Sequence, residues 1–142
     1  MKKNITHWFL ACTAILALAG CQAGQPSETA PKMETVSGTL AYRERIALPS
    51  EALVTVTLQD VSLADAPAKV IAKQQFSADG AQVPFTFELS YDPSQIDARH
   101  TYSVSARIEV DGKLRFISDT AYRVITDEAK TQQVNLLLKG VR

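Results

Sequence analysis

The sequence contains few of the side chains from which metal centres and covalent active sites are built. It has two cysteines and two histidines among its 142 residues, whereas a structural zinc site alone takes four converging ligands. It also contains no Gly-rich phosphate-binding loop and no G-x-S-x-G nucleophile elbow. We therefore expect no metal and no cofactor.

The sequence also lacks an excess of positive charge. Fifteen Lys and Arg residues balance fifteen Asp and Glu residues, whereas a nucleic-acid-binding domain needs a clustered basic footprint. We therefore expect no nucleic-acid partner.

A long apolar run is missing as well. The most apolar stretch, residues 5–19, is shorter than the roughly 20 residues that a transmembrane helix needs. It comes after Lys2 and Lys3, and a basic start before a short apolar stretch and small residues is typical of a secretory signal peptide. We predict that residues 1–20 are such a signal.

A cysteine comes directly after this stretch. Leu18, Ala19, Gly20 and Cys21 resemble the bacterial lipobox, in which the thiol receives a diacylglycerol, the signal is cut before the cysteine and the new amino terminus is acylated. The alternative is a plain signal cut elsewhere, which leaves a free thiol. Because two or more acyl chains hold a protein stably on a membrane, the lipobox predicts a permanent membrane anchor at Cys21.

Removal of the signal peptide changes the composition. Residues 1–20 hold two lysines and no acidic residue, so the mature net charge is about −2. Cys21 becomes the only cysteine, which excludes an intramolecular disulfide. Gln22 stands where an aspartate, by resemblance to enterobacterial sorting rules, retains a lipoprotein in the inner membrane. We expect the outer membrane, with the protein facing the periplasm.

Residues 21–34 differ in composition from residues 35–142. The stretch "CQAGQPSETAPKME" is rich in Pro, Gly, Ser and Ala and has no periodic apolar residues. It buries too little apolar surface to offset the entropy of ordering it, so we expect a flexible tether. Residues 35–142 have the length of a single domain.

An alternation of apolar and polar residues dominates this domain. In "LVTVTLQDV", Val54, Val56 and Leu58 share one face, and residues 83–91 and 102–110 alternate in the same way. Such stretches predict half-buried strands, and Asp111-Gly112 predicts a hairpin turn. Weaker strands are expected at 36–43, 69–76, 121–125 and 133–141.

The turn-rich loops between these stretches, without a convincing amphipathic helix, favour a β-sandwich or barrel. We predict an all-β fold, a single β-sandwich of about seven strands. One helical turn is expected in "PSQIDAR", where Asp92 can cap and Pro93 suits the first position. The predicted core consists of Phe85, Phe87, Tyr102, Val104, Ile108, Phe116 and Leu136.

Three long blocks of the domain resemble a known family. They are "VSGTLAYRERIALPSEALVTVTLQDVSLADAPAKVIAKQ", "VPFTFELSYDPSQIDARHTYSVSARI" and "LRFISDTAYRVIT", and they are similar to the YbaY and YscW lipoproteins. "YRERIALP" and "LQDVSLADAP" place the chain closer to the YbaY branch. The resemblance implies a compact periplasmic β-sandwich tethered to the outer membrane. YscW members are pilotins of type III secretion, so it also implies a secretin-like envelope partner. It supplies no site residues.

The most concentrated basic feature is "YRER", with Arg43 and Arg45. Arginine grips carboxylate or phosphate with two parallel hydrogen bonds, so these residues are a candidate patch for an anionic partner. The alternative is a solvated, salt-bridged strand edge.

An enzymatic alternative rests on acidic residues in turns. His100 with Asp92 or Asp97 is arithmetically compatible with a serine triad, and Asp60 and Asp65 flank another turn. Aspartate is, however, favoured in turns because its side chain bonds nearby backbone amides. We therefore expect a non-catalytic binding or assembly module, with an envelope carbohydrate- or glycolipid-related enzyme or ligand-binding protein as the alternative.

Overall fold

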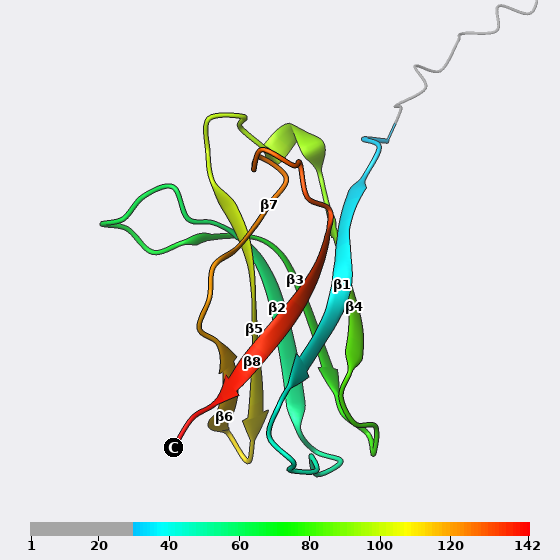
Figure 1. Cartoon of the computed structure of the whole chain (residues 1–142). Coiled ribbons are helices and arrows are strands. Elements are labelled where there is room, and N and C mark those ends of the chain that lie inside the picture. The colour runs from blue at the N-terminus through cyan, green and yellow to red at the C-terminus, as the bar shows by residue number, and fades with distance from the viewer. Residues whose placement is uncertain (1–29) are drawn as a thin grey trace, which may run out of the picture.

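The computed structural model describes residues 30–142, so the predicted signal peptide, the lipobox and most of the predicted tether lie outside the described residues. The described chain forms eight strands and one short 3-10 helix (Figure 1). The elements are β1 (Glu34–Tyr42), β2 (Leu53–Asp60), β3 (Lys69–Ser77), β4 (Phe85–Tyr91), η1 (Pro93–Gln95), β5 (Tyr102–Val110), β6 (Lys113–Ser118), β7 (Tyr122–Val124) and β8 (Gln133–Gly140). Between residues 30 and 142, no helix is long and apolar enough to cross a membrane.

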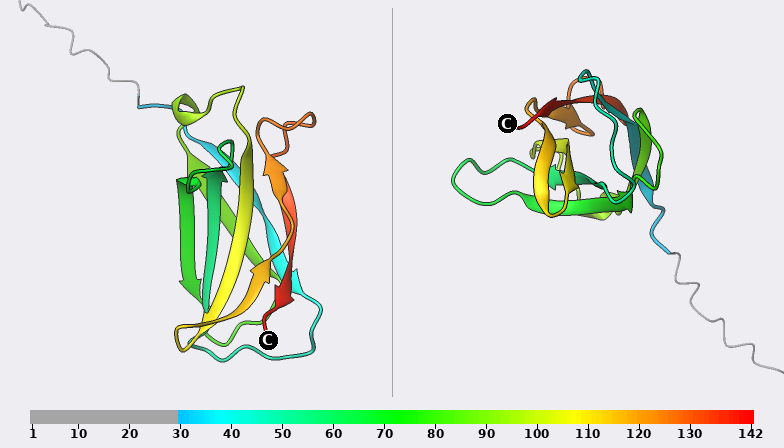
Figure 2. Two further views of the ribbon diagram at one scale, coloured as in Figure 1. Left: turned by 90° about the vertical axis from the view of Figure 1, so that its left-hand side faces the viewer. Right: turned by 90° about the horizontal axis from the view of Figure 1, so that it is seen from below.

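Backbone hydrogen bonds join the strands into one sheet. Its order is β3-β2-β5-β6-β8-β1-β4, and β7 pairs with β5 beside this path. Neighbours are antiparallel except β1 and β8, which pair in parallel. The sheet curls until its edge strands β3 and β4 come into contact, and it surrounds a central core (Figures 1 and 2). The all-β prediction is confirmed, and a sandwich is roughly compatible with this barrel-like sheet, although its opposite walls belong to one continuous sheet.

The core forms where the apolar faces of the strands meet. In β4, buried and exposed residues alternate without exception from Phe85 to Tyr91, as expected of a half-buried strand. All seven predicted core residues are buried. Thr55 alternates with Val54 and Val56 and so lies on the other face of β2. It is also buried, because Gln75 of β3 lies against it and donates a hydrogen bond of 3.0 Å to its hydroxyl. Long polar side chains on the outer face therefore extend the buried layer.

Side chains bridge two pairs of neighbouring strands that share no backbone ladder, namely β3 with β4 and β7 with β8. Between β3 and β4, the Glu88 N–H donates to the side-chain oxygen of Gln74 at 2.9 Å, and the rings of Phe76 and Phe85 meet edge to face with centroids 5.7 Å apart. Between β7 and β8, the Leu137 N–H donates to the Tyr122 hydroxyl at 2.8 Å. These contacts satisfy backbone donors that a strand ladder would otherwise satisfy.

The predicted turns are present. Asp111 and Gly112 adopt φ values of 52° and 72°, the left-handed conformation that a two-residue hairpin turn requires. Asp92 caps η1 by accepting the Ser94 N–H at 2.8 Å, and Pro93 is its first residue. Both turns depend on residue types at fixed positions, which is why the sequence predicted them.

The parallel pairing of β1 and β8 generates a first prediction. Gly38 lies opposite Val134, and a Cβ atom on Gly38 would lie only 1.7 Å from the Val134 carbonyl oxygen. Gly38→Ala must therefore push β8 away from β1, and we expect a loss of about 1–3 kcal/mol in the free energy of unfolding, measured by urea denaturation. Ser37→Ala on the same strand adds no atom and serves as the control. Equal stability of the two variants would contradict the close approach.

Candidate functional site

A groove lies at the end of the barrel where β1 finishes, opposite the end where β1 begins (Figure 1). We call it the distal groove. It has a volume of about 520 Å³. Its lining consists of Glu44, Ile46, Arg115, Phe116, Lys139, Gly140, Val141 and Arg142. Two smaller depressions continue it. One, of about 220 Å³, shares Glu44 and Lys139 and adds Arg43, Asp119, Leu137 and Leu138. The other, of about 180 Å³, shares Ile46, Arg115 and Phe116.

Phe116, at the floor of the distal groove, belongs to an aromatic stack. Tyr42, the last residue of β1, lies flat against Phe116 of β6, with ring centroids 4.0 Å apart and an angle of 10° between the rings. The Tyr42 hydroxyl donates to the Ile46 carbonyl at 2.6 Å. The turn after β1 is thereby held in place, and burial raises the pKa of Tyr42 above its ordinary value.

One carboxylate already occupies part of this groove. Glu44 accepts the Gly140 N–H at 2.9 Å, and that bond, with help from backbone N–H groups of the turn and from the charge of Lys139, lowers the pKa of Glu44. Gly140 leaves room for the carboxylate, because a Cβ atom there would lie 2.9 Å from the Glu44 Oε1 atom. The end of β8 is therefore a place where a carboxylate is stable in its charged form.

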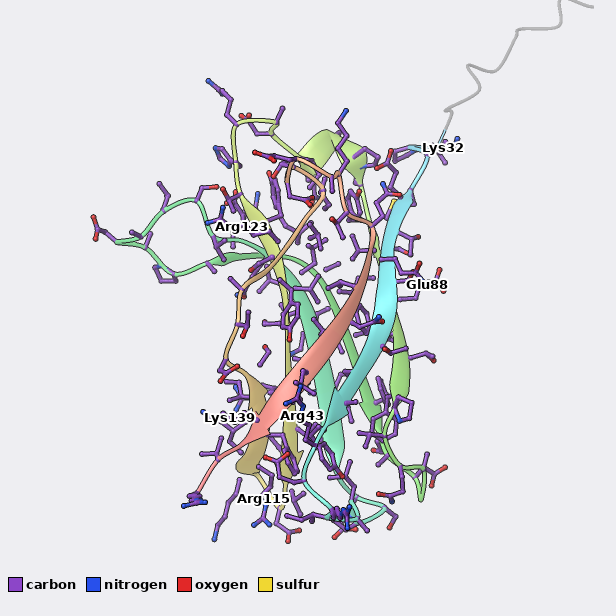
Figure 3. The ribbon with its side chains drawn as sticks, in the orientation of Figure 1. Lys32, Arg43, Glu88, Arg115, Arg123 and Lys139 are labelled. Atoms are coloured by element: carbon purple, nitrogen blue, oxygen red, sulfur yellow. The ribbon has the colours of Figure 1, made fainter. Side chains whose placement is uncertain are left out.

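Basic side chains from β6, β8 and the turn after β1 gather around the distal groove. Figure 3 shows Arg43, Arg115 and Lys139 at this end of the molecule, whereas Lys32 lies at the opposite end and Arg123 toward it. Lys139 has one weak partner, Asp119, at 3.7 Å with both side chains exposed.

Among residues 30–142, no carboxylate side chain lies within 4.0 Å of the guanidinium groups of Arg43, Arg45 or Arg115. Arg43 and Arg45 are both exposed, as in the solvated strand edge considered for them, and within residues 30–142 neither forms a salt bridge. The structure brings Arg43 into the smaller depression beside Lys139 and leaves Arg45 exposed outside the lining.

Apolar side chains flank these charges. Ile46 is 51% exposed, Val141 44% and Leu137 38%, and all three line the distal groove or its extension. Aromatic residues and arginine are enriched at protein interfaces, whereas other charged residues are depleted from their centres. A groove with an aromatic floor, half-exposed aliphatic walls and arginines fits a protein partner better than a small polar substrate.

The carboxylates considered as candidate catalytic groups stabilise turns by accepting backbone N–H groups. Asp60, Asp92 and Asp97 each accept the backbone N–H of the residue two positions further on, at 2.8–2.9 Å. Asp97 also pairs with the Arg99 guanidinium at 2.8 Å, which holds the pKa of Asp97 well below its ordinary value. Asp65 lies exposed between β2 and β3. The interpretation of Asp60, Asp92 and Asp97 as turn residues is confirmed.

His100 meets Asp60, and not Asp92 or Asp97, at the other end of the barrel. Its Nδ1 atom lies 2.6 Å from an Asp60 oxygen, and the Ser62 hydroxyl donates to the other oxygen of the same carboxylate. A catalytic triad needs the serine to bond the histidine, whereas here both bond one aspartate. The three residues link two loops, and the Ser62 bond is the largest cause of the lowered pKa of Asp60.

A second depression, of about 490 Å³, lies on the outer face of β2, β3 and β5. Thr and Ser supply four of its ten lining residues, and one of its two charged residues, Arg107, is paired with Glu109 at 2.9 Å. Within residues 30–142, no three His, Cys, Asp or Glu side chains converge as metal ligands would. The distal groove, where basic side chains lie beside exposed aliphatic ones, is therefore the stronger candidate for a functional site.

Comparisons with known proteins identify relatives of the chain. A family model described as "Type III secretion system lipoprotein chaperone (YscW)" matches residues 31–136. The chain is 41% identical over 110 residues to the "Uncharacterized lipoprotein YbaY" of Escherichia coli (strain K12), which is 78% of this chain and 58% of that protein. The chain thus spans little more than half the length of that curated relative. The resemblance that the sequence blocks predicted is confirmed.

One solved structure resembles this fold over nearly the whole length of the solved chain. It is described as an alternative pilotin from the type II secretion system of Vibrio cholerae. The TM-score is 0.76 with 64% sequence identity, over 78% of this chain and 99% of that one.

The contact between Asp60 and His100 yields a second prediction. The pKa of Asp60 is lowered in the folded state, so its contribution to stability is present above the ordinary value of about 3.9 and is lost as the pH falls through the folded pKa. We expect Asp60→Asn to lower the free energy of unfolding by about 1–2 kcal/mol at pH 7. The difference from wild type should shrink between pH 4 and pH 2.

Thermal unfolding followed by circular dichroism at several pH values measures this difference. Asp65→Asn, in the exposed loop after β2, is the matched control and should show no such pH dependence. A constant deficit of Asp60→Asn down to pH 2 would contradict the assignment.

Proposed function

Because the chain belongs to the YscW family of type III secretion lipoprotein chaperones, we propose that it is a non-catalytic chaperone of the pilotin kind. It binds an envelope protein of the secretin class and holds that protein at the outer membrane. The observation that carries this proposal is the 64% identity to a type II secretion pilotin over 99% of that structure.

The proposed anchor is the lipidated amino terminus. Residues 1–20 are removed as a signal, acyl chains on Cys21 enter the outer membrane from the periplasmic side, and residues 21–34 connect them to the domain of residues 35–142. Several acyl chains hold a protein far longer than one does. A partner bound to the domain is therefore carried to the membrane in which the acyl chains are embedded.

The arrangement of the acidic residues supports a binding role over the enzymatic alternative. Asp60 and Asp97 are held by hydrogen bonds within their own loops and by His100 and Arg99, respectively. Their carboxylates are committed to loop structure and are poorly placed to act as a general acid and base.

Cross-linking in intact cells tests the proposal. The lipidated protein is cross-linked, isolated from outer-membrane fractions in a mild detergent, and its partners are identified by mass spectrometry, with Cys21→Ser as the control. We expect one secretin with the wild type, and at least a tenfold smaller amount of that secretin in the outer-membrane fraction with Cys21→Ser. Recovery of glycan or lipid without any protein partner would contradict a chaperone role.

A further inference from the structure

The geometry points to the distal groove as the binding site for an acidic, partly apolar peptide segment of the partner protein. This inference rests on the proposed function and adds the chemistry by which the partner is recognised. It extends the candidate patch from Arg43 to residues of β6 and β8 that lie far away in the sequence.

The first argument is charge. Arg115 of β6 and Lys139 of β8 line the distal groove, and Arg43, in the turn after β1, lines the smaller depression that shares Lys139 with it. These three basic side chains gather at one end of the barrel although the whole sequence has no net charge. Both arginines lie more than 4.0 Å from every carboxylate side chain in the described part of the chain. Guanidinium groups form paired, parallel hydrogen bonds with carboxylates, so the groove is complementary to closely spaced Asp and Glu side chains.

The second argument is the carboxylate that the distal groove already holds. Glu44 shows that a carboxylate fits against the Gly140 N–H beside Lys139 and Arg115. A partner carboxylate entering the groove would find the same donors, and it would compete with Glu44 for the Gly140 N–H. Glu44 therefore occupies one anchoring point of the binding site in the free protein.

The third argument is the apolar surface between the charges. Ile46, Leu137 and Val141 are exposed to water beside the aromatic floor. Apolar side chains placed between the acidic residues of a peptide would cover them. Affinity would come from burying this surface, and the charges would set specificity and the rate of association.

The position of the groove favours a protein over the lipid headgroups of the anchoring membrane. The chain that leads to Cys21 enters at the start of β1, and the groove begins where β1 ends (Figure 1). The nine residues of β1 span roughly 30 Å at about 3.3 Å per residue. The groove thus remains accessible to a periplasmic segment while the opposite end is tethered.

Peptide binding to the full-length lipidated protein in mild detergent tests the inference. The probes are overlapping, fluorescently labelled 20-residue peptides that cover the secretin encoded in the same genome, and binding is followed by fluorescence anisotropy. We expect binding by adjacent peptides with several Asp or Glu residues among apolar ones, and weaker binding as salt is added.

Two variants with opposite expected effects locate the binding site. Arg115→Glu combined with Lys139→Glu should weaken binding at least tenfold, whereas Glu44→Ala should strengthen it severalfold by removing the competing carboxylate. The matched control, Lys32→Glu with Arg123→Glu, makes the same change in charge away from the groove (Figure 3) and should leave binding unchanged. Thermal unfolding of each variant verifies that it is folded.

The outcomes separate this inference from the proposed function. If the groove variant and the control bind peptide as the wild type does, the groove is not the site, although the chaperone role stands. The same holds if the wild type captures the whole secretin in cells but binds none of the peptides. Groove-dependent binding to phosphatidylglycerol vesicles without peptide binding would replace the protein partner by a lipid. Failure of the wild type to capture any secretin would overturn the proposed function itself.

Discussion

The pairing of the first strand with the last is the constraint on which the rest of the structure depends. β1 lies between β8, its parallel partner, and β4, its antiparallel partner. The approach of β8 is so close that only glycine fits at Gly38. This pairing links the two ends of the domain, closes most of the barrel, and brings the turn after β1 beside the end of β8. Without it Glu44 would not meet Gly140, and the distal groove would not form.

The positions of the strands could be predicted because the signal for a strand is local. Alternation is visible within a few residues, and the Asp-Gly hairpin and the Asp92 cap depend on neighbouring residues alone. The distal groove has no such signal. Arg43 marked the depression beside it, but Arg115 and Lys139 come close to Arg43 only through strand pairings between distant parts of the chain. The burial of Thr55 was missed for a similar reason, since it depends on Gln75 in another strand.

The charges are balanced in number and uneven in space. At one end of the barrel the carboxylates of Asp60 and Asp97 are paired with His100 and Arg99 in tight loops. At the other end arginines stand without acidic partners among residues 30–142. A nearly balanced charge count therefore goes with an uneven distribution. The carboxylates of Asp60 and Asp97 are paired within their loops, whereas the arginines beside the distal groove are left without a salt bridge in the described part of the chain.

The course of β1 also has a mechanical consequence. In the proposed arrangement a membrane anchor would pull on the beginning of β1, and a partner in the distal groove would pull on the ends of β6 and β8 that line it, so the load would pass between β1 and its neighbours. The ladder that joins β1 to β8 would be loaded along the strands, and its hydrogen bonds would be sheared together. β1 would then resist the pull with many hydrogen bonds at once, and would not separate from its neighbour one bond at a time. A growing assembly could thus be held from the membrane without unravelling the protein that holds it.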